Sequence, residues 1–154
     1  MQLAADVLGG ETGDAPSGIE FGLAKAVTTT DQGAQHKMMA GRARIFEAPC
    51  IHRVEVQKLP KGAVLIAGNA HSAVQAMAVE VNGIDFWGTQ FHPEMRLSDL
   101  SVIAKSLDLG ADLAVADEDQ DAAIRLGTTT QAMSLPNRAT ELVNWLAHVR
   151  VQAG

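Results

Sequence analysis

The dipeptide Asn82-Gly83 is the feature of this sequence that most restricts its fold. Both residues tolerate the positive φ angles that a type I′ turn requires, and the segments on either side, residues 74–81 and 84–91, have strand-like composition. The sequence therefore predicts an antiparallel hairpin centred on this dipeptide. His92 is expected at the end of the returning strand.

Further elements follow from the pattern of apolar residues. Apolar–polar alternation between Gly and Pro residues predicts strands at residues 19–27, 42–47, 51–56 and 63–68. Helix-forming composition and terminal Gly or Pro residues predict helices at residues 1–8, 97–107, 118–126 and 140–151. The first helix has no capping residue before it, so we expect the chain to start in the middle of an element. Strands followed by terminal helices indicate an α/β or α+β architecture.

Several conspicuous side chains have a structural explanation. The last predicted helix carries an apolar stripe that we expect to face the core, formed by Leu142, Val143, Leu146 and Val149. Trp87 and Trp145 are expected to be core or half-buried anchors. The acidic residues within 117–121 are better explained as a solvated helix start than as a cation site, because acidic side chains stabilise that end of the helix dipole.

Composition restricts the class of protein. The chain has 154 residues, 47% of them hydrophobic, so we expect one buried core and a single domain over residues 1–154. A net charge of −6 argues against a nucleic-acid partner, and no apolar run approaches the roughly 20 residues of a membrane-spanning helix. The expectation is a soluble cytoplasmic protein. Because Cys50 is the only cysteine, an internal disulfide and a cysteine-rich zinc site are excluded.

His92 and Glu94 are the main candidates for chemistry. They are two residues apart, so both side chains project from one face if the segment is extended, and Pro93 favours that conformation. A carboxylate beside an imidazole fixes one ring tautomer and leaves the other nitrogen free to act as a base. By spacing alone, a His and a Glu two residues apart on a strand are more often a surface or structural pair than a catalytic one.

The segment around this pair, GTQFHPE at residues 88–94, resembles the G-x-Q-F-H-P-E signature of class I glutamine amidotransferases. Two upstream segments resemble the subgroup similar to the glutaminase of GMP synthase: PSGIEFG at residues 16–22, and residues 52–63, which are similar to H-x-D-x-V-x-x-L-P-x-G-A. The resemblance covers residues 1–94. It implies an incomplete α/β (flavodoxin-like) domain with a mixed sheet, flanking helices and a helical C-terminal part at residues 95–154.

The resemblance also implies a Cys-His-Glu triad that hydrolyses the side-chain amide of L-glutamine and releases ammonia. His92 would act as base and then acid, with Glu94 orienting it. Gln2 matches the last residue of the family's G-x-C-x-G-x-Q nucleophile elbow, so the matching Cys would fall three residues before Met1. His52 would help to shape the glutamine pocket, with a core or surface histidine as the alternative.

Cys50 is expected to be a packed thiol rather than a substitute nucleophile. It lies at the start of a predicted strand, without the glycines and helix N-terminus that activate a thiol. No metal or cofactor is predicted, since His36, His71 and His148 lack ligand spacing and are expected at the surface.

Two functions stay open for this chain. It is either part of a glutaminase that passes ammonia to a synthetase subunit, inactive on its own, or a noncatalytic binding or regulatory module. The second function implies a partner protein or a homo-oligomer.

Overall fold

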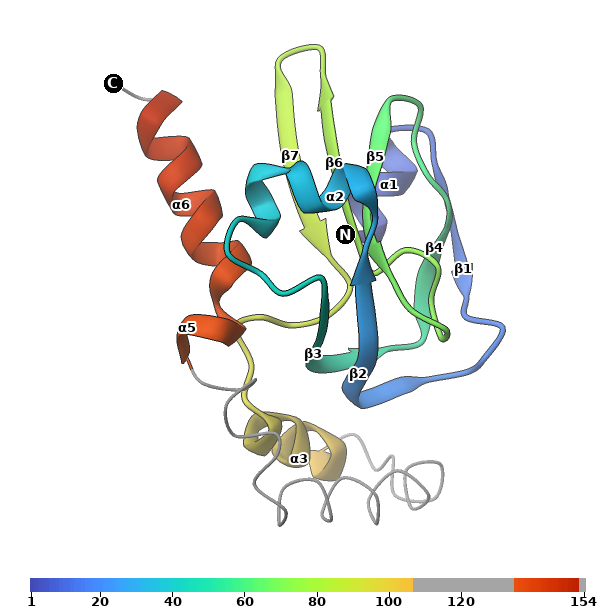
Figure 1. The fold of residues 1–154 in the computed structure, drawn as a ribbon. Helices are drawn as coiled ribbons and strands as arrows, with labels where there is room; N and C mark the ends of the chain where they lie inside the picture. The colour runs from blue at the N-terminus through green and yellow to red at the C-terminus, as the bar shows by residue number, and fades with distance from the viewer. Residues whose placement is uncertain (107–134, 153–154) are drawn as a thin grey trace.

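The computed structural model describes residues 1–106 and 135–152 of the chain. Seven strands lie in these residues: β1 (Glu11–Asp14), β2 (Glu20–Thr29), β3 (Ile45–His52), β4 (Val54–Lys58), β5 (Ala63–Gly68), β6 (Ala76–Val81) and β7 (Ile84–Thr89). Five of them form a sheet in the order β3-β2-β5-β6-β7, and β1 pairs with β4 in a second sheet (Figure 1). Every pairing among the described strands is antiparallel.

Helices flank these sheets. They are α1 (Gln2–Val7), α2 (Asp31–Gln35), the short 3-10 helix η1 (Lys37–Met39), α3 (Leu97–Ser106), α5 (Leu135–Arg138) and α6 (Thr140–Gln152). α1 contacts β1 and β4, whereas α6 contacts η1 on the other side of the molecule (Figure 1). Strands flanked by helices agree with the predicted α/β class. None of the described helices is long and apolar enough to cross a membrane.

The hairpin predicted at Asn82-Gly83 is confirmed. β6 and β7 pair from Ala76 opposite Thr89 to Val81 opposite Ile84, and the two turn residues have φ angles of 51° and 78°. Positive φ at both central residues is the type I′ geometry, whose twist matches that of the flanking strands. The hairpin thereby delivers the segment that follows Thr89 to one end of the sheet.

Two predicted strand boundaries are wrong. The patterns at residues 42–47 and 51–56 correspond to one continuous strand, β3, and to the shorter β4. Pro49 is tolerated within β3 because β3 is an edge strand, where a missing N–H costs no ladder hydrogen bond on the open side. The sequence pattern predicts neither β1 nor α2. The helix predicted at residues 118–126 lies outside the described residues.

Apolar side chains fill both faces of the larger sheet. Along β6, Ala76 and Ala78 belong to one buried cluster with Ile66, whereas Met77 belongs to a second cluster with Ala5. Successive side chains of a strand point to opposite faces, so a strand that is buried on both sides has a nearly continuous apolar sequence. Ala5 is fully buried and fixes α1 against the second face.

The apolar stripe of α6 does not face the core as predicted. Leu142, Val143 and Leu146 are 40%, 58% and 49% exposed. Glu141 and Asn144 turn toward the rest of the protein instead. Spacing along a helix identifies a stripe, but the surface that the helix meets decides which side is buried.

The surface that α6 meets is polar. Glu141 forms a buried ion pair with Arg42, with 3.2 Å between Oε1 and Nε, and Asn144 donates hydrogen bonds to the carbonyl oxygens of Met38 and Ala40. Burial raises the pKa of Glu141, and the charge of Arg42 opposes that shift. An apolar helix face in this position would leave the Arg42 charge without a partner.

Gly33 lies where α2 crosses β5. Its amide donates to Oγ1 of Thr30, the N-cap residue of α2, and the same hydroxyl donates to the carbonyl oxygen of Leu65. A Cβ on Gly33 would stand 2.0 Å from the carbonyl oxygen of Ile66. Because that oxygen is part of the β5 backbone, the contact accepts only a residue without a Cβ.

We expect Gly33→Ala to lower the free energy of unfolding by about 1–3 kcal/mol, the usual cost of forcing extra atoms into a packed interior. Gln32→Ala, at an exposed position of the same helix, is the matched control and should change stability little. Urea denaturation followed by circular dichroism measures both variants. Equal stability of the two would contradict the close approach of α2 to β5.

Candidate active site

His92 and Glu94 lie together just beyond β7. Nδ1 of His92 and Oε1 of Glu94 are 2.8 Å apart, and the two side chains are 29% and 53% exposed. When Nδ1 carries the proton that the carboxylate accepts, Nε2 keeps its lone pair and can take a proton from another group. The pair therefore has the geometry of an oriented general base.

The backbone of this His–Glu pair is fixed by contacts from two other elements. The amide of His92 donates to the carbonyl oxygen of Pro49 in β3 (2.7 Å), and Nη1 of Arg138 in α5 donates to the carbonyl oxygen of Glu94 (2.8 Å). Arg138 is only 8% exposed, and Pro93, which stands between the two residues in the sequence, is buried. The pair is thus held by β3 and by α5.

Gln2 reaches the same segment from α1. Its Nε2 donates to Oε1 of Gln90 (3.1 Å) and to the carbonyl oxygen of Val54 (3.0 Å), while Nε2 of Gln90 donates to that same carbonyl (2.6 Å). Gln90 precedes His92 by two residues. The structure therefore brings the start of α1 next to the segment that carries His92.

His52 lies in a second cluster, which is centred on the carboxylate of Glu20. Nε2 of His52 is 2.8 Å from Oε2 of Glu20, and Asn69 and Gln75 donate to the same carboxylate at 2.7 and 2.6 Å. Burial raises the pKa of Glu20, but hydrogen bonds from His52, Asn69 and Gln75 outweigh burial and bring the pKa below its ordinary value. Glu20 is therefore ionised at neutral pH.

Cys50 is unsuited to be the nucleophile that a general base at His92 requires. Its side chain is fully buried, and Sγ lies 3.6 Å from Oε2 of Glu20. Burial and the negative charge of Glu20 raise the pKa of the Cys50 thiol far above its usual value. A nucleophilic cysteine needs the opposite environment, with positive charge nearby and some exposure. The prediction that Cys50 is packed is confirmed.

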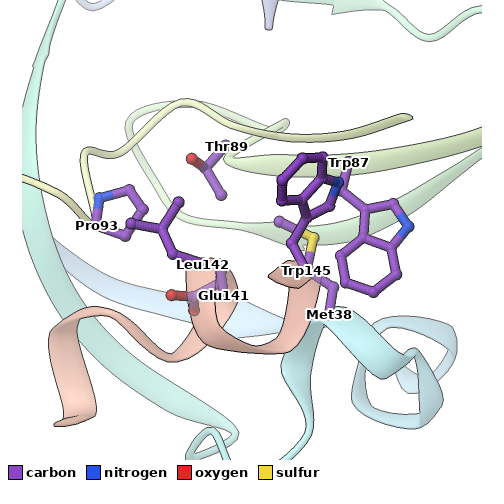
Figure 2. Close-up of a pocket in the computed structure, with 7 residues that line it drawn as sticks. All are labelled: Met38, Trp87, Thr89, Pro93, Glu141, Leu142 and Trp145. Atoms are coloured by element: carbon purple, nitrogen blue, oxygen red, sulfur yellow. The ribbon is translucent and has the colours of Figure 1, made fainter. Parts of the chain in front are cut away.

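A pocket of about 130 Å³ lies between β7 and α6 (Figure 2). It is lined by Met38, Trp87, Thr89, Pro93, Glu141, Leu142 and Trp145. Pro93 reaches it from the segment of the His–Glu pair, but neither His92 nor Glu94 lines it. The imidazole and the carboxylate of the pair therefore lie outside this pocket. Trp87 is half-buried as predicted, and Trp145 is 42% exposed.

The three histidines expected at the surface are half-buried. His36 and His148 pack against Trp87, with ring centroids 5.1 and 4.7 Å away, and His71 lies edge-on to His52 at 5.8 Å. An imidazole has an apolar ring and a polar tip, so it can pack against an aromatic ring while its nitrogens reach polar groups. The aromatic partners lie far away in the sequence, which is why local spacing missed them.

Sequence reasoning also missed three residues that support these clusters. Gln90 and Glu20 stand inside segments 88–94 and 16–22, so the similarity of these segments to the family was an available signal. No sequence signal pointed to Arg138, because its contact with Glu94 joins residues 44 positions apart.

Comparison with known proteins identifies the class. Residues 1–107 match the family of class-I glutamine amidotransferases. This match covers well over half of the 154 residues, and the chain belongs to that family. The family and the α/β fold expected from the sequence are therefore confirmed.

Three proteins illustrate the similarity. A gamma-glutamyl-L-1-hydroxyisopropylamide hydrolase of Pseudomonas sp is 37% identical over 100 residues, which cover 62% of this chain and 33% of that protein. One subunit of the glutamine-hydrolyzing GMP synthase of Saccharolobus solfataricus is 36% identical over 95 residues, which cover 62% of this chain and 47% of that protein. A glutamine amidotransferase of Thermotoga maritima superposes with a TM-score of 0.64 and 16% identity, over 93% of this chain and 55% of that one. The chain spans less than half of either sequence relative.

We expect Cys50 to react with an aromatic disulfide reagent at least about a hundredfold more slowly in the native protein than in urea, because the reaction requires the core to open. Glu20→Gln removes the neighbouring negative charge and should speed the native reaction. Glu80→Gln, at an exposed position of β6, is the control and should leave it unchanged. Absorbance of the released thiolate measures the rates, and rapid labelling of the native wild-type chain would contradict the buried thiol.

Proposed function

We propose that this chain is the histidine- and glutamate-bearing part of a glutaminase that hydrolyses the side-chain amide of L-glutamine. The hydrogen bond between His92 and Glu94 carries the proposal, because it orients an imidazole whose Nε2 can accept a proton. Membership of the class-I glutamine amidotransferase family supports it. So does the similarity to two proteins named for hydrolysis, one of glutamine and one of a gamma-glutamyl amide.

In the proposed reaction His92 takes the proton of a cysteine thiol, and the thiolate attacks the amide carbon of glutamine. The resulting tetrahedral intermediate collapses to a γ-glutamyl thioester when His92 returns the proton to the departing ammonia. Water then attacks the thioester with His92 as base, the C–S bond breaks, and glutamate leaves as the thiol takes back its proton. Glu94 orients the ring and stabilises its charged form in both steps.

The thiol of this reaction comes from a segment outside these 154 residues. Cys50 is the only cysteine of the sequence, and it is buried beside the charge of Glu20. In this proposal Gln2 holds the start of α1 next to the His92 segment, and His52 shapes the wall of the glutamine pocket from β3. The ammonia produced would pass to a synthetase subunit.

A noncatalytic binding or regulatory module is the second candidate function. Exposed apolar side chains on two helices favour it: on α1, Leu3 and Val7 are 78% and 75% exposed and lie one turn apart. Leu142 and Leu146 form a similar exposed pair on α6. In this second function further polypeptide would cover these side chains, whether a synthetase, a second copy or more of the same domain.

We expect the 154-residue chain alone to release no ammonia from glutamine, because no accessible thiol faces His92. A coupled assay with glutamate dehydrogenase measures ammonia directly. If the wild-type chain turned over glutamine and Cys50→Ser abolished this turnover, Cys50 would be the nucleophile. That result would overturn this part of the proposal.

Joining this chain to the part of the Saccharolobus protein that precedes its matched region should restore ammonia release. In that chimera His92→Ala should lower kcat by at least about a thousandfold, the usual cost of losing the base of a triad. Glu94→Gln keeps the shape but loses the charge and should lower kcat less. His148→Ala, away from the pair, is the control. An active chimera that is indifferent to His92→Ala would rule out the catalytic role and favour the binding module.

A further inference from the structure

Three different metal-binding side chains meet at one buried point between β2 and β3. They are Glu20, Cys50 and His52, which are 7%, 0% and 8% exposed. Their ligand atoms all lie within 4.8 Å of one another, with 2.8 Å between the nitrogen and the carboxylate oxygen and 3.6 Å between the sulfur and that oxygen. Bonds of about 2.0–2.3 Å to a tetrahedral zinc ion place two ligand atoms about 3.3–3.8 Å apart. The sulfur and the carboxylate oxygen already have this spacing, whereas the imidazole nitrogen and the carboxylate oxygen would separate slightly to reach it.

The sheet itself creates this arrangement. Cys50 and His52 are two residues apart on β3, so their side chains point to the same face. The antiparallel register pairs Glu20 with His52 and Gly22 with Cys50. Because glycine has no side chain, the position opposite Cys50 adds nothing that would fill the space.

We propose that Glu20, Cys50 and His52 bind a zinc ion through Oε2, Sγ and Nε2, at a site that goes beyond the glutaminase function. Carboxylate, thiolate and imidazole are all ligands that zinc accepts in proteins. A water molecule would complete four-coordination. The site is structural, since its three ligands are at least nine-tenths buried.

Charge supports a cation at this point. Without a metal the Cys50 thiol carries its proton, and its sulfur lies 3.6 Å from Oε2 of Glu20. Zinc would replace that proton: the S–H bond breaks, an S–Zn bond forms, and one proton leaves to solvent. Thiolate and carboxylate together carry two negative charges, which one divalent cation neutralises.

His52 can change from hydrogen-bond donor to metal ligand at this site. Its Nε2 now bonds to Glu20, while its buried Nδ1 has no hydrogen-bond partner among the described residues. Metal binding moves the ring proton from Nε2 to Nδ1, so the hydrogen bond from Nε2 to Glu20 is exchanged for a bond from Nε2 to the metal. Asn69 and Gln75 already donate to the Glu20 carboxylate and would hold it in place as outer-shell partners.

An open pocket gives a route to the site. The pocket has a volume of about 290 Å³, and Glu20, Asn69 and His71 are among its lining residues. Glu20 thus forms part of both the pocket wall and the buried cluster. A hydrated cation entering here meets the Glu20 carboxylate before the other two ligands, because neither Cys50 nor His52 lines the pocket.

Titration of the metal-free 154-residue chain with Co²⁺ tests the proposal, because a cobalt–thiolate bond gives a charge-transfer band in the near ultraviolet. Cys50 is the only cysteine, so the band reports on this site alone. We expect one cobalt per chain, displacement by Zn²⁺, and release of a proton on binding. Cys50→Ser should abolish the band and weaken zinc binding, followed by calorimetry, by at least about a hundredfold.

His148→Asn is the matched control, because His148 also faces a carboxylate, that of Asp85, but in a cluster without sulfur. This variant should keep the band and the zinc affinity of the site. A chain that folds, as shown by circular dichroism, but gives no charge-transfer band would overturn the proposal. The proposal would also be overturned if Cys50→Ser left zinc binding unchanged and His148→Asn removed it. If Cys50→Ser does not fold, the charge-transfer band of the wild-type chain still tests the proposal, because its absence would overturn a cobalt–thiolate bond at Cys50.

Discussion

The buried carboxylate of Glu20 ties several strands of the larger sheet together. It stands at the start of β2 and accepts hydrogen bonds from β3 through His52 and from the segment after β5 through Asn69 and Gln75. Gln75 in turn accepts, through its backbone oxygen, the amide of Gln90 at 2.7 Å. A single ionised group thus connects three parts of the chain to the segment that carries the His–Glu pair. Losing it would leave several buried donors without an acceptor.

The sequence predicted the elements whose causes are local. The turn at Asn82-Gly83 needs only two residues that tolerate positive φ, and these can be recognised without knowledge of the rest of the fold. The two predicted strands at residues 42–47 and 51–56 left Pro49 between them, whereas it lies inside β3. Its tolerance depends on the edge position of β3, which only the assembled sheet reveals. The polar inward side of α6 likewise depends on Arg42, about a hundred residues earlier in the chain.

The candidate site likewise has features with local causes and features that depend on distant parts of the chain. His92 and Glu94 are two residues apart, so their hydrogen bond could be anticipated from the sequence, and similarity to the family singled out the segment. The similarity to the family also singled out Gln2, and the structure adds the contact of Gln2 with Gln90. The support from Arg138 could not be foreseen, since it comes from a stretch that matches no family pattern. The proximity of Glu20 to Cys50 depends on strand register, because the two are 30 residues apart in the chain.

Electrostatics explains why Cys50 suits the proposed zinc site but not the role of catalytic nucleophile. A nucleophilic thiol must lose its proton without help from a bound ion, so it needs positive charge or a helix N-terminus nearby. Cys50 has a carboxylate at 3.6 Å and no solvent, and both favour the protonated thiol. A divalent cation reverses that balance, because the carboxylate then strengthens the site that stabilises the thiolate. The environment that excludes Cys50 from glutamine chemistry is therefore the one that suits a metal ligand, and the two proposals can succeed or fail independently.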